Sequence, residues 1–254
     1  MRWDPRQYAR YRSERNRPFF DLVSQIGAEQ PSSVVDLGCG PGELTATLAD
    51  RWPGAEVRGL DSSAEMIERS QQYRTDRVRF DRADAAEFSA EGVDVLVSNA
   101  LLQWVPGHRE LLRRWAGELN PGGWLAFQVP DNFGSPSHVL MRELAESPAW
   151  AGRLAGVLRH ADAVAPAEDY LDLLTRAGLR VTAWQSRYLH VLTGADPVLE
   201  WVRGTGLRPV LAALPAEAAA EFEREYAARL RAAYPAAEYG TVFPFLRTFV
   251  VAAK

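Results

Sequence analysis

The sequence predicts an α/β fold built on a mostly parallel, Rossmann-like sheet of seven strands, and three observations support this. First, the β-branched run Val34-Val35-Asp36-Leu37 breaks into a glycine-rich loop and then into a helical pattern. Second, short apolar runs alternate with helical patterns along most of the chain, as they do in βαβ units. Third, acidic residues end two of these runs, where a parallel sheet gathers its ligand-binding groups.

The loop after the first strand carries Gly38, Gly40 and Gly42. Glycine permits positive φ and leaves the backbone bare, so a small ligand can lie against the unpaired N–H groups of the following helix. A dinucleotide fingerprint needs a third glycine three places after the second, and Glu43 stands there. The spacing therefore disfavours NAD. A glycine turn that only closes a β–α connection remains the alternative.

The other predicted elements follow in order. Strands are expected at Glu56–Asp61, Val78–Ala85, Val93–Asn99, Trp124–Val129, Leu179–Tyr188 and Leu246–Ala252, and helices at Phe19–Ile26, Leu44–Arg51, Glu110–Leu119, Ala167–Ala177, Asp196–Gly204 and Ala216–Ala233.

Two of these strands end in acids that suit a nucleoside. An acid at the carboxyl end of the second strand of such a sheet meets ribose hydroxyls, which makes Asp61 the predicted ribose anchor. Ser62 follows it at the start of a helix, and Met66 could pack on an adenine ring. Asp84 ends the third strand and could equally cap a helix.

About fifty residues separate the last two strands, far more than an ordinary connection, and their pattern is helical. We interpret them as a helical cap over the ligand-binding edge, with a solvated decoration as the alternative. The predicted organisation is residues 1–30 as an N-terminal lid and helix, 31–188 as the Rossmann-like core, 189–241 as the cap inserted between strands six and seven, and 242–254 as the final core strand.

Composition limits the function classes. A net charge of −4 disfavours nucleic acid as a bulk electrostatic partner. Cys39 is the only cysteine, which excludes an internal disulfide or a cysteine-based zinc site and favours a reducing cytoplasm. No apolar run suits export or membrane insertion, so a cytoplasmic protein with a small-molecule ligand is expected. Lys254 is the only lysine among the 29 basic residues, and arginine binds carboxylates bidentately.

The acid two places before the first glycine, in Asp36-x-Gly38-x-Gly40-x-Gly42, makes the loop resemble motif I of the class I S-adenosylmethionine-dependent methyltransferases. In that superfamily the loop cradles the amino-acid end of S-adenosylmethionine. The resemblance implies cofactor-binding roles for the loop, for the acids that end the strands and for their neighbours: Tyr8, Arg17, Asp36, Gly38, Cys39, Gly40, Gly42, Asp61, Ser62, Met66, Asp84, Ala85 and Asn99.

Several other segments resemble one family within this superfamily, the trans-aconitate methyltransferases. They are Trp3-x-Pro5-x-x-Tyr8, Ser13-Glu14-Arg15-x-Arg17-Pro18, Asn99-Ala100-x-Leu102-Gln103-Trp104, Pro130-Asp131-Asn132, Pro136-x-His138-Val139-Leu140-Met141-Arg142-Glu143 and Trp201-Val202-x-x-Thr205-Gly206-Leu207-Arg208-Pro209. The resemblance implies methyl esterification of one carboxylate of trans-aconitate or a closely related polycarboxylate.

A carboxylate is already ionised at neutral pH, so this reaction needs no general base and no catalytic residue is assigned. We expect Gln103, Trp104 and His138 to position the reacting group. Polar and cationic side chains would bind the substrate: Gln103, Trp104, Asn132, His138, Arg142, Arg203, Arg208, Tyr239 and Arg247.

Two other functions remain open at this point. One is a methyltransferase that acts on another small molecule and needs no arginine cluster. The other is a non-catalytic regulatory protein that binds S-adenosylmethionine. The N-terminal Arg- and Tyr-rich segment is expected to be a lid, with a solvated leader as its alternative.

Overall fold

The computed structural model describes residues 12–158 and 163–254, and the predicted lid residue Tyr8 lies outside them. The chain forms two compact units, which we describe separately. Unit 2 contains Arg15–Pro130, Val164–Ser186 and Arg247–Lys254, whereas unit 1 contains Asp131–Ala163, Arg187–Leu246 and the first described residues, up to Glu14. Strands β6 (Arg180–Leu192) and β8 (Gly240–Ala253) run through both units.

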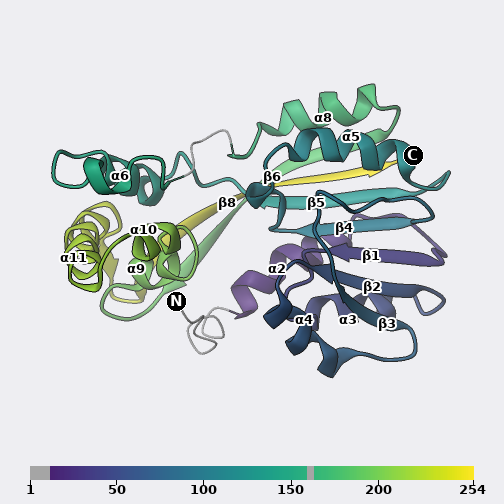
Figure 1. Ribbon diagram of the computed structural model, residues 1–254, viewed down its shortest axis with the longest axis horizontal. Coiled ribbons are helices and arrows are strands. Elements are labelled where there is room, and N and C mark those ends of the chain that lie inside the picture. The colour runs from purple at the N-terminus through teal and green to yellow at the C-terminus, as the bar shows by residue number, and fades with distance from the viewer. Residues whose placement is uncertain (1–11, 159–162) are drawn as a thin grey trace. The chain divides into compact units, whose positions relative to one another are not determined.

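Unit 2 holds the parallel part of the sheet (Figure 1). Its strands are β1 (Ser33–Leu37), β2 (Glu56–Asp61), β3 (Val78–Arg82), β4 (Val95–Asn99) and β5 (Trp124–Pro130), which β8 and β6 extend in the order β3-β2-β1-β4-β5-β8-β6. Neighbours from β3 to β5 pair in parallel, and β8 pairs antiparallel with β5. The prediction of an α/β fold with a mostly parallel seven-stranded path is confirmed.

The central strands are apolar because helices cover both faces of a parallel sheet. Val34, Leu96 and Phe127 are fully buried in β1, β4 and β5. Helices α3 (Glu43–Arg51) and α4 (Ala64–Ser70) pack beside β2 and β3, while α5 (His108–Glu118) and α8 (Ala167–Arg176) pack on each other (Figure 1). Helix α2 (Arg12–Val23) and the short 3-10 helices η1 (Gln71–Tyr73) and η2 (Leu102–Trp104) complete the described elements of this unit.

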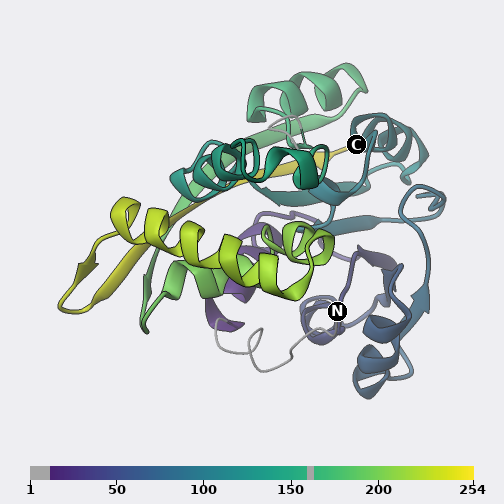
Figure 2. The same cartoon turned by 60° about the vertical axis from the view of Figure 1, so that its left-hand side comes forward.

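Unit 1 is mainly helical. It contains α6 (Pro136–Ala145), α7 (Ala151–Leu154), α9 (Pro197–Arg203), α10 (Arg208–Ala213), α11 (Ala216–Ala233) and the two-residue strand β7 (Ala236–Ala237). The long helix α11 packs on α6 and α9 (Figure 2). Aromatic rings fill the core, where Trp150 meets Phe222 at 5.2 Å and Trp201 meets Phe243 at 5.8 Å between ring centroids. Such pairs add to the hydrophobic stabilisation of a core.

The observed units divide the chain differently from the predicted segments. Helices α6 and α7 precede the predicted cap in sequence but pack with α10 and α11, so Asp131–Ala163 groups with unit 1. Strand β8 starts at Gly240 rather than Leu246, because Thr241, Phe243 and Phe245 continue its alternation of buried positions.

Several other boundaries also differ. Strand β6 runs on to Leu192, beyond the predicted end at Tyr188. Strand β3 stops at Arg82, so Asp84 follows the strand instead of ending it. Helix α2 begins at Arg12 and ends at Val23, earlier than the predicted Phe19–Ile26.

Candidate functional site

The glycine loop of unit 2 joins β1 to α3 in the predicted strand–turn–helix arrangement. All three glycines have positive φ, +84° at Gly38, +54° at Gly40 and +84° at Gly42. A Cβ added at Gly38 would lie 2.9 Å from Cβ of Leu101, and one at Gly42 would lie 2.7 Å from Cβ of Ser70. A Cβ at Gly40 would meet nothing within 4 Å. Two glycines are therefore required by packing, whereas the third leaves bare backbone facing open space.

Asp61, at the end of β2, holds this loop in place. Its Oδ2 accepts a hydrogen bond from Gly40 N at 3.0 Å, and its Oδ1 accepts one from Ser63 N at 2.8 Å. A carboxylate offers about four acceptor sites, so two of them remain for a ligand's hydroxyl groups. The sequence predicted the ligand contact of Asp61 but not its support of the loop.

Asp61 also lines a cavity of about 300 Å³ at the carboxyl ends of the parallel strands. Its walls come from the glycine loop, the ends of β2 and β3, and the segment after β4: Leu37, Gly38, Leu60, Asp61, Ser62, Ala83, Asp84, Ala85, Ala86, Leu101, Trp104, Val105 and Pro106. The volume lies at the lower end of the range for small-molecule sites. The two carboxylates in this lining, Asp61 and Asp84, suit a nucleoside, whose hydroxyl and amino groups donate and whose ring is apolar, so the cavity fits S-adenosylmethionine.

Asp84 makes a local bond as well, because its Oδ1 accepts from Ala86 N at 2.9 Å. This bond closes a turn at residues 85–87 and not a helix, so the helix-cap alternative is wrong, and the adenine contact stays a prediction. Met66 is half-buried in the first turn of α4, where Ser63 Oγ accepts from Met66 N at 3.4 Å. Arg17 lies in α2, exposed and 3.5 Å from Asp21.

Beneath the loop, Asp36 and Cys39 are buried. Asp36 Oδ2 accepts from the hydroxyl of Thr45 at 2.6 Å, while its Oδ1 has no partner in the described part of the chain. Burial raises the pKa of Asp36 to about 7, and the nearby charge of Asp61 adds to the effect although the Thr45 hydroxyl opposes it. Burial and the same carboxylates raise the pKa of the Cys39 thiol, which keeps it neutral and unreactive.

The segment after β4 forms one wall of the cavity. Ala100 adopts a left-handed φ of +57°, which only a small minority of non-glycine residues do. Its N–H donates to the carbonyl of Gln128 at 2.9 Å, and its own carbonyl accepts from Nε2 of Gln103 at 2.6 Å. Gln103 is thus buried beneath the wall, whereas Trp104 lines the cavity and is 48% exposed.

A second buried contact stabilises the same wall of the cavity. His108, at the start of α5, bonds through Nδ1 to the carbonyl of Val105 at 3.2 Å and through Nε2 to the hydroxyl of Tyr170 at 2.8 Å. The carbonyl can only accept, so Nδ1 carries the proton and Nε2 accepts from Tyr170. Burial lowers the pKa of His108, consistent with this neutral form. Sequence reasoning missed this pair, because nothing in the sequence connects residues 62 positions apart.

In unit 1, two candidate residues lie on α6. His138 and Arg142 are four residues apart on the helix and so share a face. Both contact Phe133, whose ring centroid lies 5.7 Å from that of His138 and whose carbonyl accepts from Arg142 Nη2 at 2.6 Å. A Cβ added at Gly206 would lie 3.3 Å from Nε2 of His138, so the segment before Arg208 approaches the same face.

Other predicted substrate residues of unit 1 are occupied or exposed. The Asn132 amide bridges to Leu246, donating to its carbonyl and accepting from its N–H, both at 2.9 Å. The Arg203 guanidinium pairs with Glu200 and with Glu223, the latter at 2.6 Å. Arg208 opens α10 and is exposed, and Tyr239 is 66% exposed in the turn between β7 and β8.

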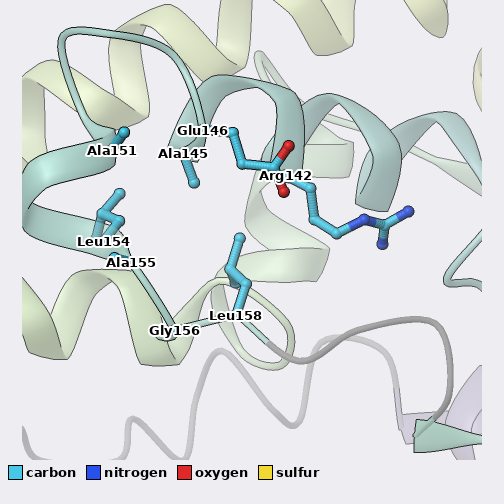
Figure 3. Close-up of a pocket in the computed structure, with 8 residues that line it drawn as sticks. All are labelled: Arg142, Ala145, Glu146, Ala151, Leu154, Ala155, Gly156 and Leu158. Atoms are coloured by element: carbon cyan, nitrogen blue, oxygen red, sulfur yellow. The ribbon is translucent and has the colours of Figure 1, made fainter.

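A cavity of about 200 Å³ lies within unit 1, between α6, α7 and the turn that follows (Figure 3). Its wall is mostly apolar, with Ala145, Ala151 and Leu154 among the lining residues. Arg142 also lines this cavity, and its guanidinium extends away from Ala151 and Leu154 (Figure 3).

Two classes of site do not occur in the part of the chain that the structure describes. No group of three or more His, Cys, Asp or Glu side chains is arranged there to hold a metal ion. None of the helices seen there has the length and apolar character needed to cross a membrane.

Several known proteins are similar in sequence to this chain over nearly all of its residues. Residues 8–183 match the family model described as a methyltransferase domain. A trans-aconitate 2-methyltransferase from Streptomyces coelicolor is 54% identical over 262 residues, covering 99% of this chain and 86% of the relative. One from Streptomyces avermitilis is 52% identical over 260 residues, covering 99% and 97%.

Solved structures are similar in fold at low identity. The YcgJ protein from Bacillus subtilis has a TM-score of 0.60 at 14% identity, covering 94% of this chain and 98% of that one. A phosphoethanolamine N-methyltransferase from Haemonchus contortus, in complex with phosphomonomethylethanolamine and S-adenosylhomocysteine, has a TM-score of 0.54 at 15% identity, covering 94% of this chain and 52% of that one.

Proposed function

Because the chain belongs to the trans-aconitate 2-methyltransferases, we propose that it methylates one carboxylate of trans-aconitate, giving the monomethyl ester and S-adenosylhomocysteine. The observation that carries the proposal is the extent of the similarity. The methyltransferase-domain match ends at residue 183, whereas the Streptomyces relatives remain similar over 99% of the chain, including helices α9, α10 and α11 of unit 1.

When bound, S-adenosylmethionine supplies an electrophilic methyl group on a sulfonium sulfur. The residues that would hold it are those of the cavity and the glycine loop in unit 2. The bare backbone at Gly40 would lie against its amino-acid end, Asp61 would bind the ribose hydroxyls and Asp84 the adenine amino group, with Met66 against the ring. Tyr8, Arg17, Asp36, Cys39, Ser62, Ala85 and Asn99 complete the set carried over from the superfamily.

The chain itself has to bind, orient and desolvate the acceptor. A carboxylate needs no proton removed, so the side chains must hold one oxygen in line with the methyl group and exclude water from the site. Positioning of that kind can supply ~7–11 kcal/mol of the barrier reduction. The absence of a reactive thiol agrees with this mechanism, because the buried Cys39 stays protonated.

A tricarboxylate also needs cations for the groups that do not react, since an unpaired buried charge is costly. Arg142 is the strongest candidate, with His138 on the same helix face and Arg208 on the neighbouring segment. Arg203 is the weakest, because two glutamates already neutralise it. Gln103 and Trp104 would shape the wall beside the reacting oxygen.

The test is a turnover assay with methyl-labelled S-adenosylmethionine. Trans-aconitate, other di- and tricarboxylic acids and neutral acceptors are supplied in parallel, and products are identified by mass spectrometry. We expect a monomethyl ester of trans-aconitate as the main product. Efficient methylation of neutral acceptors would favour a methyltransferase of another substrate class, and binding without any turnover would favour a regulatory protein.

A further inference from the structure

A line of three polar side chains crosses the buried part of unit 2. Arg247 of β8 donates from Nη1 to Oε1 of Gln128 on β5 at 3.1 Å, and Gln128 donates from Nε2 to Oδ1 of Asn99 on β4 at 2.6 Å. Arg247 is 5% exposed and Gln128 is fully buried, whereas Asn99 is half-buried at the carboxyl end of its strand. We call these three residues the amide relay.

Elementary chemistry fixes the direction of this relay. A guanidinium has only donors, so Gln128 must turn its oxygen toward Arg247. Its NH₂ group therefore faces Asn99, whose side-chain oxygen must accept the hydrogen bond. The Asn99 amide is left with both N–H donors on the far side of the relay, and no residue in the described part of the chain accepts from its Nδ2.

Stability alone gives a poor reason for this arrangement. Taking a guanidinium out of water is expensive, and an apolar side chain of similar volume often serves a core as well or better. Gln128 is also out of place in β5: the other residues of this strand are apolar, and the side-chain amide of Gln128 is fully buried among them. A cation that orients two amides in series has a clearer use if the last amide contacts a ligand.

The position of Asn99 identifies that ligand. The strand order β3-β2-β1-β4 places it two strands from Asp61, which ends β2. Asn99 does not line the nucleoside cavity, although the wall residues Leu101 and Trp104 follow it directly in sequence. An amide donor at this point suits an oxygen near the transferred methyl group, beyond the ribose.

We propose that Arg247 is a positioning residue that acts through Gln128 to present the N–H donors of Asn99 to a carboxylate of the acceptor. The inference rests on the proposed function and refines it. Asn99 passes from the cofactor-binding set to the substrate-binding set, and Arg247 acts on the substrate indirectly instead of touching it.

The sharpest perturbation is Gln128→Glu. The new carboxylate keeps the shape of the side chain and gains an ion pair with Arg247, but it can only accept hydrogen bonds. Asn99 then has to turn its NH₂ group toward position 128 and its oxygen toward the acceptor, where it repels a carboxylate. Asn99→Asp is a second variant that removes the donors directly at a half-buried site. Gln185→Glu on β6 is the matched control, because Gln185 is exposed and lies outside the relay and the cavity.

For both relay variants we expect kcat/KM for trans-aconitate to fall roughly 10- to 100-fold, the loss typical of a hydrogen bond to a charged group. The affinity for S-adenosylhomocysteine measured by calorimetry should stay within about twofold of wild type, as should all properties of Gln185→Glu. Unchanged turnover in both relay variants would overturn the proposal. So would a loss of S-adenosylhomocysteine affinity with an unchanged KM for the acceptor, because the amide would then serve the cofactor.

The direction of the relay can also be measured without turnover. The side-chain ¹H–¹⁵N resonances of Asn99, assigned by their loss in Asn99→Asp, should show one proton shifted downfield in Gln128→Glu, where it donates to a carboxylate. Unshifted resonances would refute the relay even if wild type methylates trans-aconitate. Wild type that methylates no polycarboxylate would refute the proposed function instead, whatever the resonances show.

Discussion

Removal of the Asp61 carboxylate should weaken both the glycine loop and cofactor binding. Asp61→Ala leaves Gly40 N and Ser63 N without their acceptor, and hydrogen bonds to a charged group contribute ~1.5–3 kcal/mol each. Asp61 is partly exposed, so water replaces some of that, and we expect the free energy of unfolding to fall by ~2–3 kcal/mol. Loss of the ribose contacts should cost a further ~1.5–3 kcal/mol in binding, or about 10- to 150-fold in Kd.

Urea unfolding and calorimetry with S-adenosylhomocysteine measure these two effects separately. Asp81→Ala is the matched control, because Asp81 lies on the next strand and forms an exposed ion pair with Arg58 at 2.9 Å. Such a pair contributes at most ~1 kcal/mol, and cofactor affinity should not change. Wild-type affinity in Asp61→Ala, or an equal loss in Asp81→Ala, would refute the role of Asp61.

Three further outcomes follow from the same contacts. Because burial raises the pKa of Asp36 to about 7, the folded protein keeps a proton that the unfolded chain releases near pH 4, so the free energy of unfolding should fall as the pH rises from 4 to 7, by up to about 1.4 kcal/mol for each pH unit. Asp36→Asn lacks this contribution, so its free energy of unfolding should fall less over the same pH range, and an equal decrease in wild type and variant would show that the pKa is not raised. Gly38→Ala should destabilise the protein by at least ~1 kcal/mol more than Gly40→Ala in denaturant unfolding, because only the first brings a Cβ within 2.9 Å of Leu101, and equal losses would contradict the packing argument. Arg142→Lys keeps the charge but loses the two-point fork, so kcat/KM for trans-aconitate should fall roughly tenfold or more, whereas full activity would show that charge alone is sufficient.

Local patterns predicted most of the fold. The β-branched runs that became β1, β2 and β4 are short and bounded by clear turn residues, and α11 was predicted at its observed limits. Strand β8 was predicted too short because Pro244 and the polar residues before it interrupt the apolar run. The pairing of Gly240 and Thr241 with β7, together with the alternating burial that continues to Phe245, shows that this segment belongs to the strand.

The candidate site was predictable only where one segment carries the chemistry. The glycine loop and Asp61 combine a motif with a strand end, so both could be found from sequence. Gln128 and the pair formed by His108 and Tyr170 depend on distant contacts that no spacing encodes. A buried Gln inside an apolar strand was the one available signal for the amide relay.

The ratio of kcat/KM for trans-aconitate to that for a monocarboxylic acid of the same chain length tests the central claim most directly. Each additional carboxylate that pairs with an arginine should contribute ~1.5–3 kcal/mol to transition-state binding, so the ratio should exceed about tenfold. A ratio near one in the wild-type protein would contradict an enzyme that recognises a polycarboxylate.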